Sequence, residues 1–71
     1  MGFTKAEAEA KVGQWIKTRI EWLGVEAGTI GKVVKADSLG EVWSVVIRWD
    51  WPRTRHDWFT KDEYKKFLEE I

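Results

Sequence analysis

Two stretches of the chain alternate apolar and polar side chains with a period of two, and this pattern limits the possible folds most strongly. In "QWIKTRIEW" one face carries Ile16, Thr18, Ile20 and Trp22. In "VWSVVIRWDW" one face carries Trp43, Val45, Ile47 and Trp49, in line with Trp51. Successive side chains of a β-strand point to opposite faces, so this period is typical of half-buried antiparallel strands. We therefore expect a mainly β fold.

Two further strands complete the predicted sheet. The segment "TIGKVVKA" is joined to the tryptophan-rich strand by "DSLGE", where Gly40 can adopt the positive φ of a short hairpin loop. Pro52 lacks a backbone donor and ends the tryptophan-rich strand, and a brief strand follows from His56 to Phe59. Four to five short antiparallel strands favour a small, partly open barrel.

A short helix is predicted before the strands, over residues 4–12. Thr4 can accept a hydrogen bond from the amide of Glu7 while the Glu7 side chain reaches back, which is the capping-box pattern. The alanines and the Glu7–Lys11 pair favour a helix after this cap. Gly13 is expected to end it.

A second helix is predicted over residues 61–70. Thr60 and Glu63 repeat the capping-box spacing, and Phe59 with Tyr64 matches a hydrophobic staple. A single apolar stripe follows at helical spacing, formed by Tyr64, Phe67, Leu68 and Ile71. Residues 1–71 are thus expected to form one domain, with the barrel over residues 14–59 between the two helices.

The core of so short a chain has to be built without a disulfide or a thiolate zinc site, because the 71 residues include no cysteine. Six tryptophans can supply buried area. Trp22, Trp43 and Trp49 alternate in step with aliphatic neighbours, so we expect them in the core. Trp15 lies on the other face of its strand; it is either exposed or, as we expect, covered by the first helix.

Charge and hydropathy exclude several classes of protein. Twelve basic and twelve acidic residues cancel, which argues against avid non-specific binding to nucleic acid. No apolar run approaches membrane-spanning length, and the start "MGFTKAEAEAK" has no hydrophobic signal region. We expect a cytoplasmic protein that does not contact the membrane.

The segment "GTIGKV" (Gly28 to Val33) has the Gly-x-x-Gly-x-Val spacing of KOW-type SH3-like domains. The longer order "GTIGKVV…WSVVIRW…DWFTKDEY" resembles the SH3-like barrels of the photosystem I accessory subunit and the ferredoxin–thioredoxin reductase variable chain. This resemblance spans about residues 14–64 and implies an SH3-like fold. The N-terminal helix is an addition to that pattern, and a helix is expected in place of the final strand.

The segment "IRWDWPRTRHDWF" carries the candidate binding site, formed by Trp51, Arg53, Arg55 and Trp58. Exposed aromatic rings beside arginines can hold an extended peptide in a groove or stack nucleic-acid bases. In a purely structural alternative, the two tryptophans cap the open end of the barrel. The favoured hypothesis is a non-enzymatic module that binds a protein or peptide partner.

Two alternatives remain open. One is RNA or single-stranded nucleic-acid binding by the KOW-like turn and the cations Lys32, Lys35, Arg48, Arg53 and Arg55. The other is an accessory subunit whose tryptophan surface is covered by a second copy, as a homodimer.

No catalytic, cofactor or metal site is expected. His56 is the single histidine, and Asp57 next to it should point to the opposite face of the strand. One imidazole without a second spaced ligand makes no recognisable metal site. The run "GVEAGTIG" lacks the Gly-Lys-Ser/Thr ending of a phosphate loop, so its glycines are interpreted as turn residues.

Overall fold

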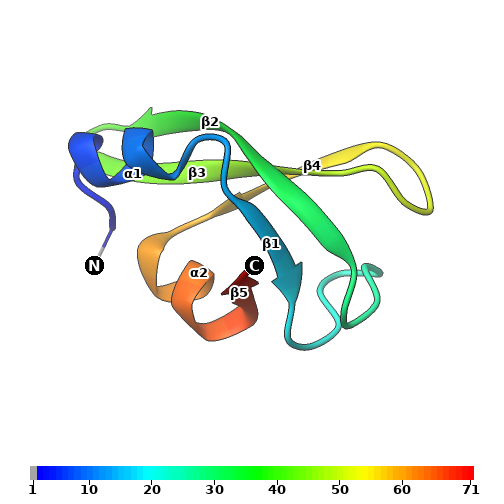
Figure 1. Ribbon diagram of the computed structural model, residues 1–71. Helices are drawn as coiled ribbons and strands as arrows, with labels where there is room; N and C mark the ends of the chain where they lie inside the picture. Colours follow the sequence, from blue (N-terminus) through cyan, green and yellow to red (C-terminus); the bar gives the residue numbers. More distant parts are fainter. Residues whose placement is uncertain (1) are drawn as a thin grey trace.

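A computed structural model describes residues 2–71, which form one antiparallel sheet and two short helices (Figure 1). In chain order the elements are α1 (Lys5–Lys11), β1 (Trp15–Thr18), β2 (Ile30–Leu39), β3 (Val42–Trp49), β4 (Arg55–Phe59), α2 (Lys61–Phe67) and β5 (Leu68–Glu70). The strand order is β4-β3-β2-β1-β5. The mainly β prediction is confirmed. Within the described residues the sheet is open, because its edge strands β4 and β5 do not pair with each other.

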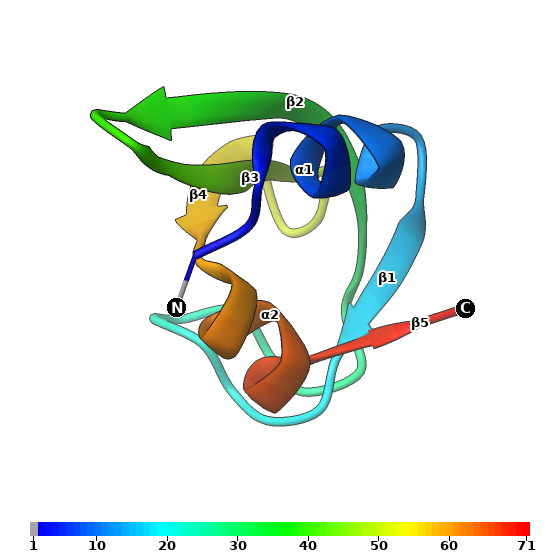
Figure 2. The same ribbon diagram turned by 90° about the vertical axis from the view of Figure 1, so that its left-hand side faces the viewer.

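The core lies between the sheet and the two helices, which sit on the same side of it (Figure 2). Ala8 of α1 and Tyr64 of α2 both belong to this core. The largest fully buried side chains are Trp49, Phe59, Ile16, Ile47, Val33 and Val45. Of the three tryptophans predicted in the core, Trp49 is fully buried. Trp22 and Trp43 are half-buried and pack against the buried core residues.

Local hydrogen bonds begin both helices as predicted. Thr4 and Glu7 form a complete capping box at α1, and Thr60 and Glu63 form another at α2. Gly13, with a φ of 96°, follows the end of α1. These contacts need only residues three positions apart, so the sequence alone is sufficient to predict them.

The second helix is shorter than predicted. It ends at Phe67, and Leu68 adopts an extended conformation that begins β5. The backbone of β1 offers an open edge, and residues 68–70 pair with it in an antiparallel register from Thr18 to Ile16. Pairing with β1 satisfies backbone groups that one more helical turn would leave to solvent. The predicted apolar stripe is therefore wrong at its end, where Ile71 is 64% exposed.

The first strand also ends earlier than predicted. It stops at Thr18, whose side-chain hydroxyl donates to the Glu26 carbonyl 2.8 Å away and anchors a loop. Because the extended conformation ends there, Ile20 is 49% exposed instead of buried. Trp22 lies in that loop, yet its side chain still packs against the core, with the centroids of its ring and the Phe59 ring 4.7 Å apart.

Two glycines are required by the β2–β3 hairpin. Gly40 has a φ of 67° in the tight turn, as predicted. Gly31 is not the turn residue that we expected, because it lies within β2; it is required there because a Cβ would lie 2.6 Å from the ring of Trp49. This glycine of the "GTIG" segment therefore makes room for the largest core side chain.

Candidate binding site beside Trp51

The loop between β3 and β4 projects from one end of the molecule (Figure 1). Three of its residues line a small cleft together with residues of the flanking strands and of the β1–β2 loop. The cleft has a volume of about 160 Å³. Its lining residues are Gly24, Val25, Trp49, Trp51, Pro52, Arg53 and Arg55. The structure thus brings three of the four sequence-predicted site residues to one place, which we call the Trp51 cleft. Gly24 and Val25 complete it from the loop between β1 and β2, which the sequence pattern indicated as a turn but did not place beside these residues.

The side chain of Arg55 lines the Trp51 cleft and is held in place by its own contacts. Its Nε lies 2.9 Å from Oδ2 of Asp57, and one of its terminal nitrogens donates to the carbonyl of Leu23. Asp57 also accepts a hydrogen bond from the Trp49 indole at 2.9 Å. These contacts neutralise the charge of Arg55 and join the β1–β2 loop to β4, so this arginine mainly positions the cleft.

Arg53 differs from Arg55 in having no bound partner. No hydrogen bond or ion pair joins its guanidinium to any other residue in the range 2–71. The neighbouring Trp51 is 64% exposed. The cleft therefore combines an uncompensated cation with a largely exposed aromatic ring.

Trp58 lies apart from the other three residues, on the opposite face of the sheet. In an antiparallel pair, residues directly opposite each other share a face. Arg55 is opposite the buried Trp49, whereas Trp58 is opposite Val46. The Trp58 indole donates to Oδ2 of Asp37 on β2 at 2.9 Å, so its ring crosses β3.

The ring of Trp58 has a structural role on that outer face. Val46 and Ser44 point outward from β3, yet they are only 3% and 6% exposed. A ring that spans from β4 to Asp37 covers them. The hydrogen bond from Trp58 is also the main cause that lowers the pKa of the Asp37 carboxyl below its usual value.

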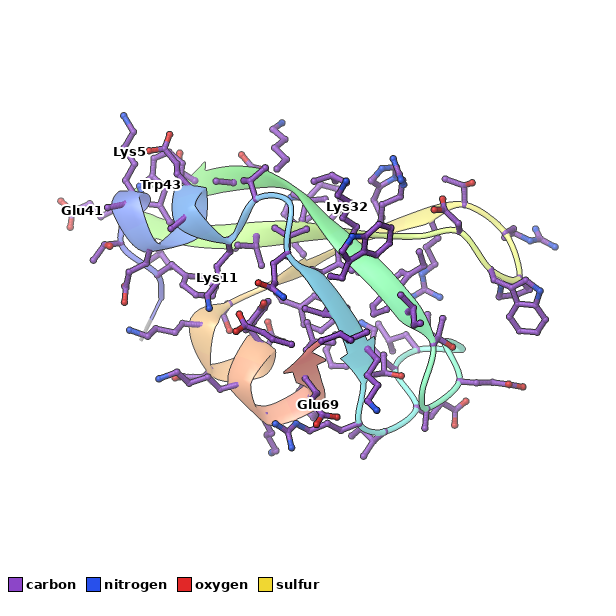
Figure 3. All side chains as sticks on the ribbon, in the orientation of Figure 1. Lys5, Lys11, Lys32, Glu41, Trp43 and Glu69 are labelled. Carbon is purple, nitrogen blue, oxygen red and sulfur yellow. The ribbon has the colours of Figure 1, made fainter. Side chains whose placement is uncertain are left out.

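Trp15 is not covered by the first helix, contrary to our expectation. It is 49% exposed, and the amino group of Lys32 lies 5.1 Å from its ring centroid. Figure 3 shows Lys32 projecting from β2 on the side of the sheet away from α2. Ala8 buries α1 against the core face, so the helix cannot reach Trp15.

His56 and Asp57 point to opposite faces of β4, as expected for neighbouring residues of a strand. The His56 side chain is exposed, whereas Asp57 points to the core face and binds Arg55 and Trp49. No group of three or more histidine, cysteine, aspartate or glutamate side chains within those residues is arranged to hold a metal ion. Within the same part of the chain, neither helix has the length and apolar character needed to cross a membrane.

A second, larger cleft of about 660 Å³ lies between the two helices and β5. Its lining comes from three separate parts of the chain: the N-terminal segment with α1, the residue after β1, and the continuous segment of α2 and β5. Sequence periodicity could not identify it, because β5 itself was not predicted. We call it the interhelix cleft.

Searches against protein-family models, curated proteins and solved structures found no match to this chain.

Proposed function

We propose that this chain is a non-enzymatic interaction module with an SH3-like, partly open barrel, and that it binds a protein or peptide partner at the Trp51 cleft. The supporting observation is the 64% exposure of Trp51 next to the partnerless Arg53. Tryptophan and arginine are the residue types that most often dominate binding energy at protein interfaces. A cytoplasmic location is part of the proposal, in keeping with the cysteine-free composition.

The size of the cleft favours a side chain of a larger partner over a free small molecule. Small-molecule sites usually occupy about 300–1,000 Å³, whereas this cleft holds about 160 Å³. One apolar side chain of an extended segment could enter between Trp51 and Pro52. A carboxylate nearby in the same segment would then pair with Arg53, since Arg55 is already bound to Asp57.

The distribution of charge supports a peptide over a nucleic acid. The Nε of Arg48 lies 3.2 Å from Oδ1 of Asp50, and Arg55 pairs with Asp57. The amino group of Lys32 lies over the Trp15 ring. Two of the five cations that could form a basic stripe, Arg48 and Arg55, are therefore paired with a carboxylate, which interrupts the stripe. Nucleic-acid binding normally needs a continuous field of free positive charge.

Selection from a random peptide library on the immobilised protein tests the proposal. We expect enrichment of peptides that combine an apolar side chain with an acidic residue. Trp51→Ala and Arg53→Glu should each abolish the enrichment, and neither should lower the melting temperature noticeably, because both side chains are exposed. His56→Ala, an exposed change on the outer face, is the matched control and should leave the enrichment intact.

Three results would overturn the proposal. The first is equal enrichment by the parent and Trp51→Ala. The second is tight binding of single-stranded RNA that weakens steeply with salt, which would indicate phosphate contacts instead. The third is a dimer that Trp51→Ala dissociates, which would assign the surface to a second copy of the chain.

A further inference from the structure

The interhelix cleft has an apolar floor. Phe3 and Tyr64 meet edge to face with their ring centroids 5.7 Å apart, and Leu68 lies beside them in the lining. These three side chains are buried, and they form the base of the cleft between α1 and α2. A volume of about 660 Å³ lies within the range of small-molecule sites. The cleft can therefore hold a ligand with an apolar body.

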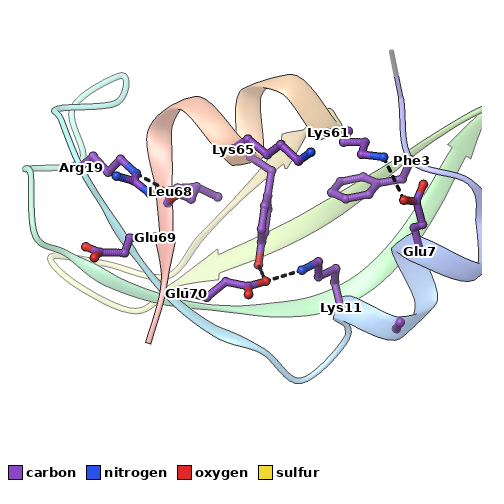
Figure 4. A pocket seen from close by; sticks show the side chains of 11 residues that line it. Phe3, Glu7, Lys11, Arg19, Lys61, Lys65, Leu68, Glu69 and Glu70 are labelled. Atoms are coloured by element: carbon purple, nitrogen blue, oxygen red, sulfur yellow. Dashed lines mark hydrogen bonds and ion pairs between the residues drawn. The ribbon is translucent and has the colours of Figure 1, made fainter.

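Three lysines surround this floor. Lys61 and Lys65 reach from α2, and Lys11 reaches from α1, toward the space between the helices (Figure 4). Lys11 binds Glu70, and Lys61 lies 2.9 Å from Glu7. Lys65 has no hydrogen bond or ion pair with another described residue. Of the three lysines, Lys65 is therefore the one whose amino group makes no ion pair among the described residues, although its charge also stabilises the nearby Asp62 carboxylate.

The two paired lysines can turn toward a ligand at small cost. Their ion pairs are exposed to solvent, with each side chain between 28% and 43% exposed, and such pairs stabilise a protein only weakly. Each glutamate carboxylate also accepts a hydrogen bond from a second donor, which would remain. The Glu7 carboxylate accepts the backbone amide of Thr4 at 2.9 Å, and Glu70 accepts the hydroxyl of Tyr64 at 2.8 Å. Neither carboxylate would lose all its hydrogen bonds when its lysine moves.

A fourth cation lies at the far end of the cleft. The Nε of Arg19 donates to the Leu68 carbonyl at 3.1 Å, and its backbone amide donates to the Phe67 carbonyl at 2.8 Å. These bonds hold Arg19 against the end of α2 (Figure 4). Its terminal guanidinium nitrogens have no hydrogen-bond partner among the described residues.

From this geometry we propose that the interhelix cleft binds a small phosphate monoester whose organic part is apolar. The phosphate lies among the amino groups of Lys11, Lys61 and Lys65, and the organic part rests on Phe3 and Tyr64. A phosphate dianion offers three terminal oxygens to three ammonium groups, and lysine is well suited to phosphate as a mobile point charge. A monocarboxylate carries one charge and would only repeat the pairing that Glu7 and Glu70 already provide.

A nuclear magnetic resonance titration at constant ionic strength tests this site with phenyl phosphate, inorganic phosphate and phenol as probes. Phenyl phosphate should shift the amide signals of residues 5–11 and 61–70. It should bind about tenfold more tightly than inorganic phosphate or phenol, because only phenyl phosphate uses both the lysines and the apolar floor. Equal affinity for phenyl phosphate and inorganic phosphate would overturn the proposal.

Two lysine variants on the same helix locate the site. Lys65→Ala should weaken phenyl phosphate binding about fivefold. Lys66→Ala removes the same charge from a residue outside the cleft lining and should change the affinity by less than about twofold. Equal losses in the two variants would show general attraction to charge and refute a defined site. Tighter binding of a single-stranded oligonucleotide than of phenyl phosphate would assign the lysines to a nucleic-acid backbone.

This site is independent of the Trp51 cleft, with which it shares no lining residue. Trp51→Ala should therefore leave phenyl phosphate binding unchanged. Loss of binding in that variant, or amide shifts confined to the β3–β4 loop, would contradict the assignment to the interhelix cleft.

Discussion

At the scale of single residues, Trp49, Trp51 and Trp58 lie close together in the chain but in three different environments. Trp49 is fully buried, Trp51 is 64% exposed in a loop, and Trp58 is 52% exposed across the outer face of β3. Strand register decides the environments of Trp49 and Trp58, whereas Trp51 lies in the loop beyond the end of β3. The residue opposite each position on the neighbouring strand determines which face it shares. The same residue type therefore builds the core, lines a cleft and covers a sheet.

Replacing Trp49 with alanine should lower the free energy of unfolding by about 3–5 kcal/mol, because a fully buried ring is removed and a cavity remains. Thermal and denaturant unfolding would measure this loss. Trp51→Ala is the control and should melt close to the parent. Trp43→Ala should fall between the two, since Trp43 is half-buried. Equal stability of the Trp49 and Trp51 variants would contradict the burial described here.

At the scale of elements, α2 and β5 form a continuous unit of helix and strand without a connecting loop. Phe67 is the last helical residue, and Leu68 is already paired opposite Thr18 on β1. The last residue of α2 is followed directly by a strand, so no separate C-terminal turn stabilises the helix. The stability of α2 therefore depends on the hydrogen bonds at its N-terminus. The capping box of Thr60 and Glu63 provides these bonds, with the Thr60 hydroxyl accepting the Glu63 amide at 3.3 Å.

Thr60→Ala should therefore lower the free energy of unfolding by about 0.5–2 kcal/mol, the usual effect of losing a helix cap. Thr54→Ala removes the same hydroxyl from an exposed loop position and should have little effect. Circular dichroism melts of both variants provide the comparison. Matching melting temperatures would mean that the Thr60 cap does not stabilise α2.

At the scale of the whole molecule, two ion pairs connect segments far apart in the sequence. Glu7 of α1 binds Lys61 of α2, and Lys11 of α1 binds Glu70 of β5. Both cross the interhelix cleft, so the same contacts join the two ends of the chain and form the walls of a proposed site. Burial and the hydrogen bond to Glu70 raise the pKa of Tyr64, which keeps its hydroxyl protonated as a donor.

The Glu7 pair makes stability depend on pH in the acid range. The hydrogen bond from Lys61, followed by that from the Thr4 backbone, lowers the pKa of Glu7 from 4.5 to about 2. Because the folded pKa is the lower one, the unfolded chain binds the proton first. The stabilisation from Glu7, which screening by solvent keeps small, is present above pH 4.5 and is lost as the pH falls toward about 2.

Glu7→Gln should weaken this pH dependence while keeping the capping box, since glutamine serves at the same position of that motif. Unfolding curves between pH 2 and pH 5 would compare the variant with the parent over the range bounded by the two Glu7 pKa values. The exposed Glu9→Gln on the same helix is the control and should follow the parent curve. An unchanged slope in Glu7→Gln would contradict the role assigned to the Lys61 pair.

The sequence by itself determined the features that depend on near neighbours. Both capping boxes, the turn at Gly40 and the alternation of β3 follow from spacings of two to four residues, so they are visible in a single chain. The grouping of Trp51, Arg53 and Arg55 also depends on near neighbours in the sequence, because one loop carries Trp51 and Arg53 and leads directly into Arg55.

The tertiary structure alone decided the features that depend on distant partners. Residues 68–70 became a strand because β1 offered an open edge, although their spacing favoured a helix. Trp58 was separated from the Trp51 cleft by the register of β4 on β3. The interhelix cleft exists only because α1, α2 and β5 meet there. Such contacts join residues tens of positions apart, and local periodicity carries no information about which distant segments will pair.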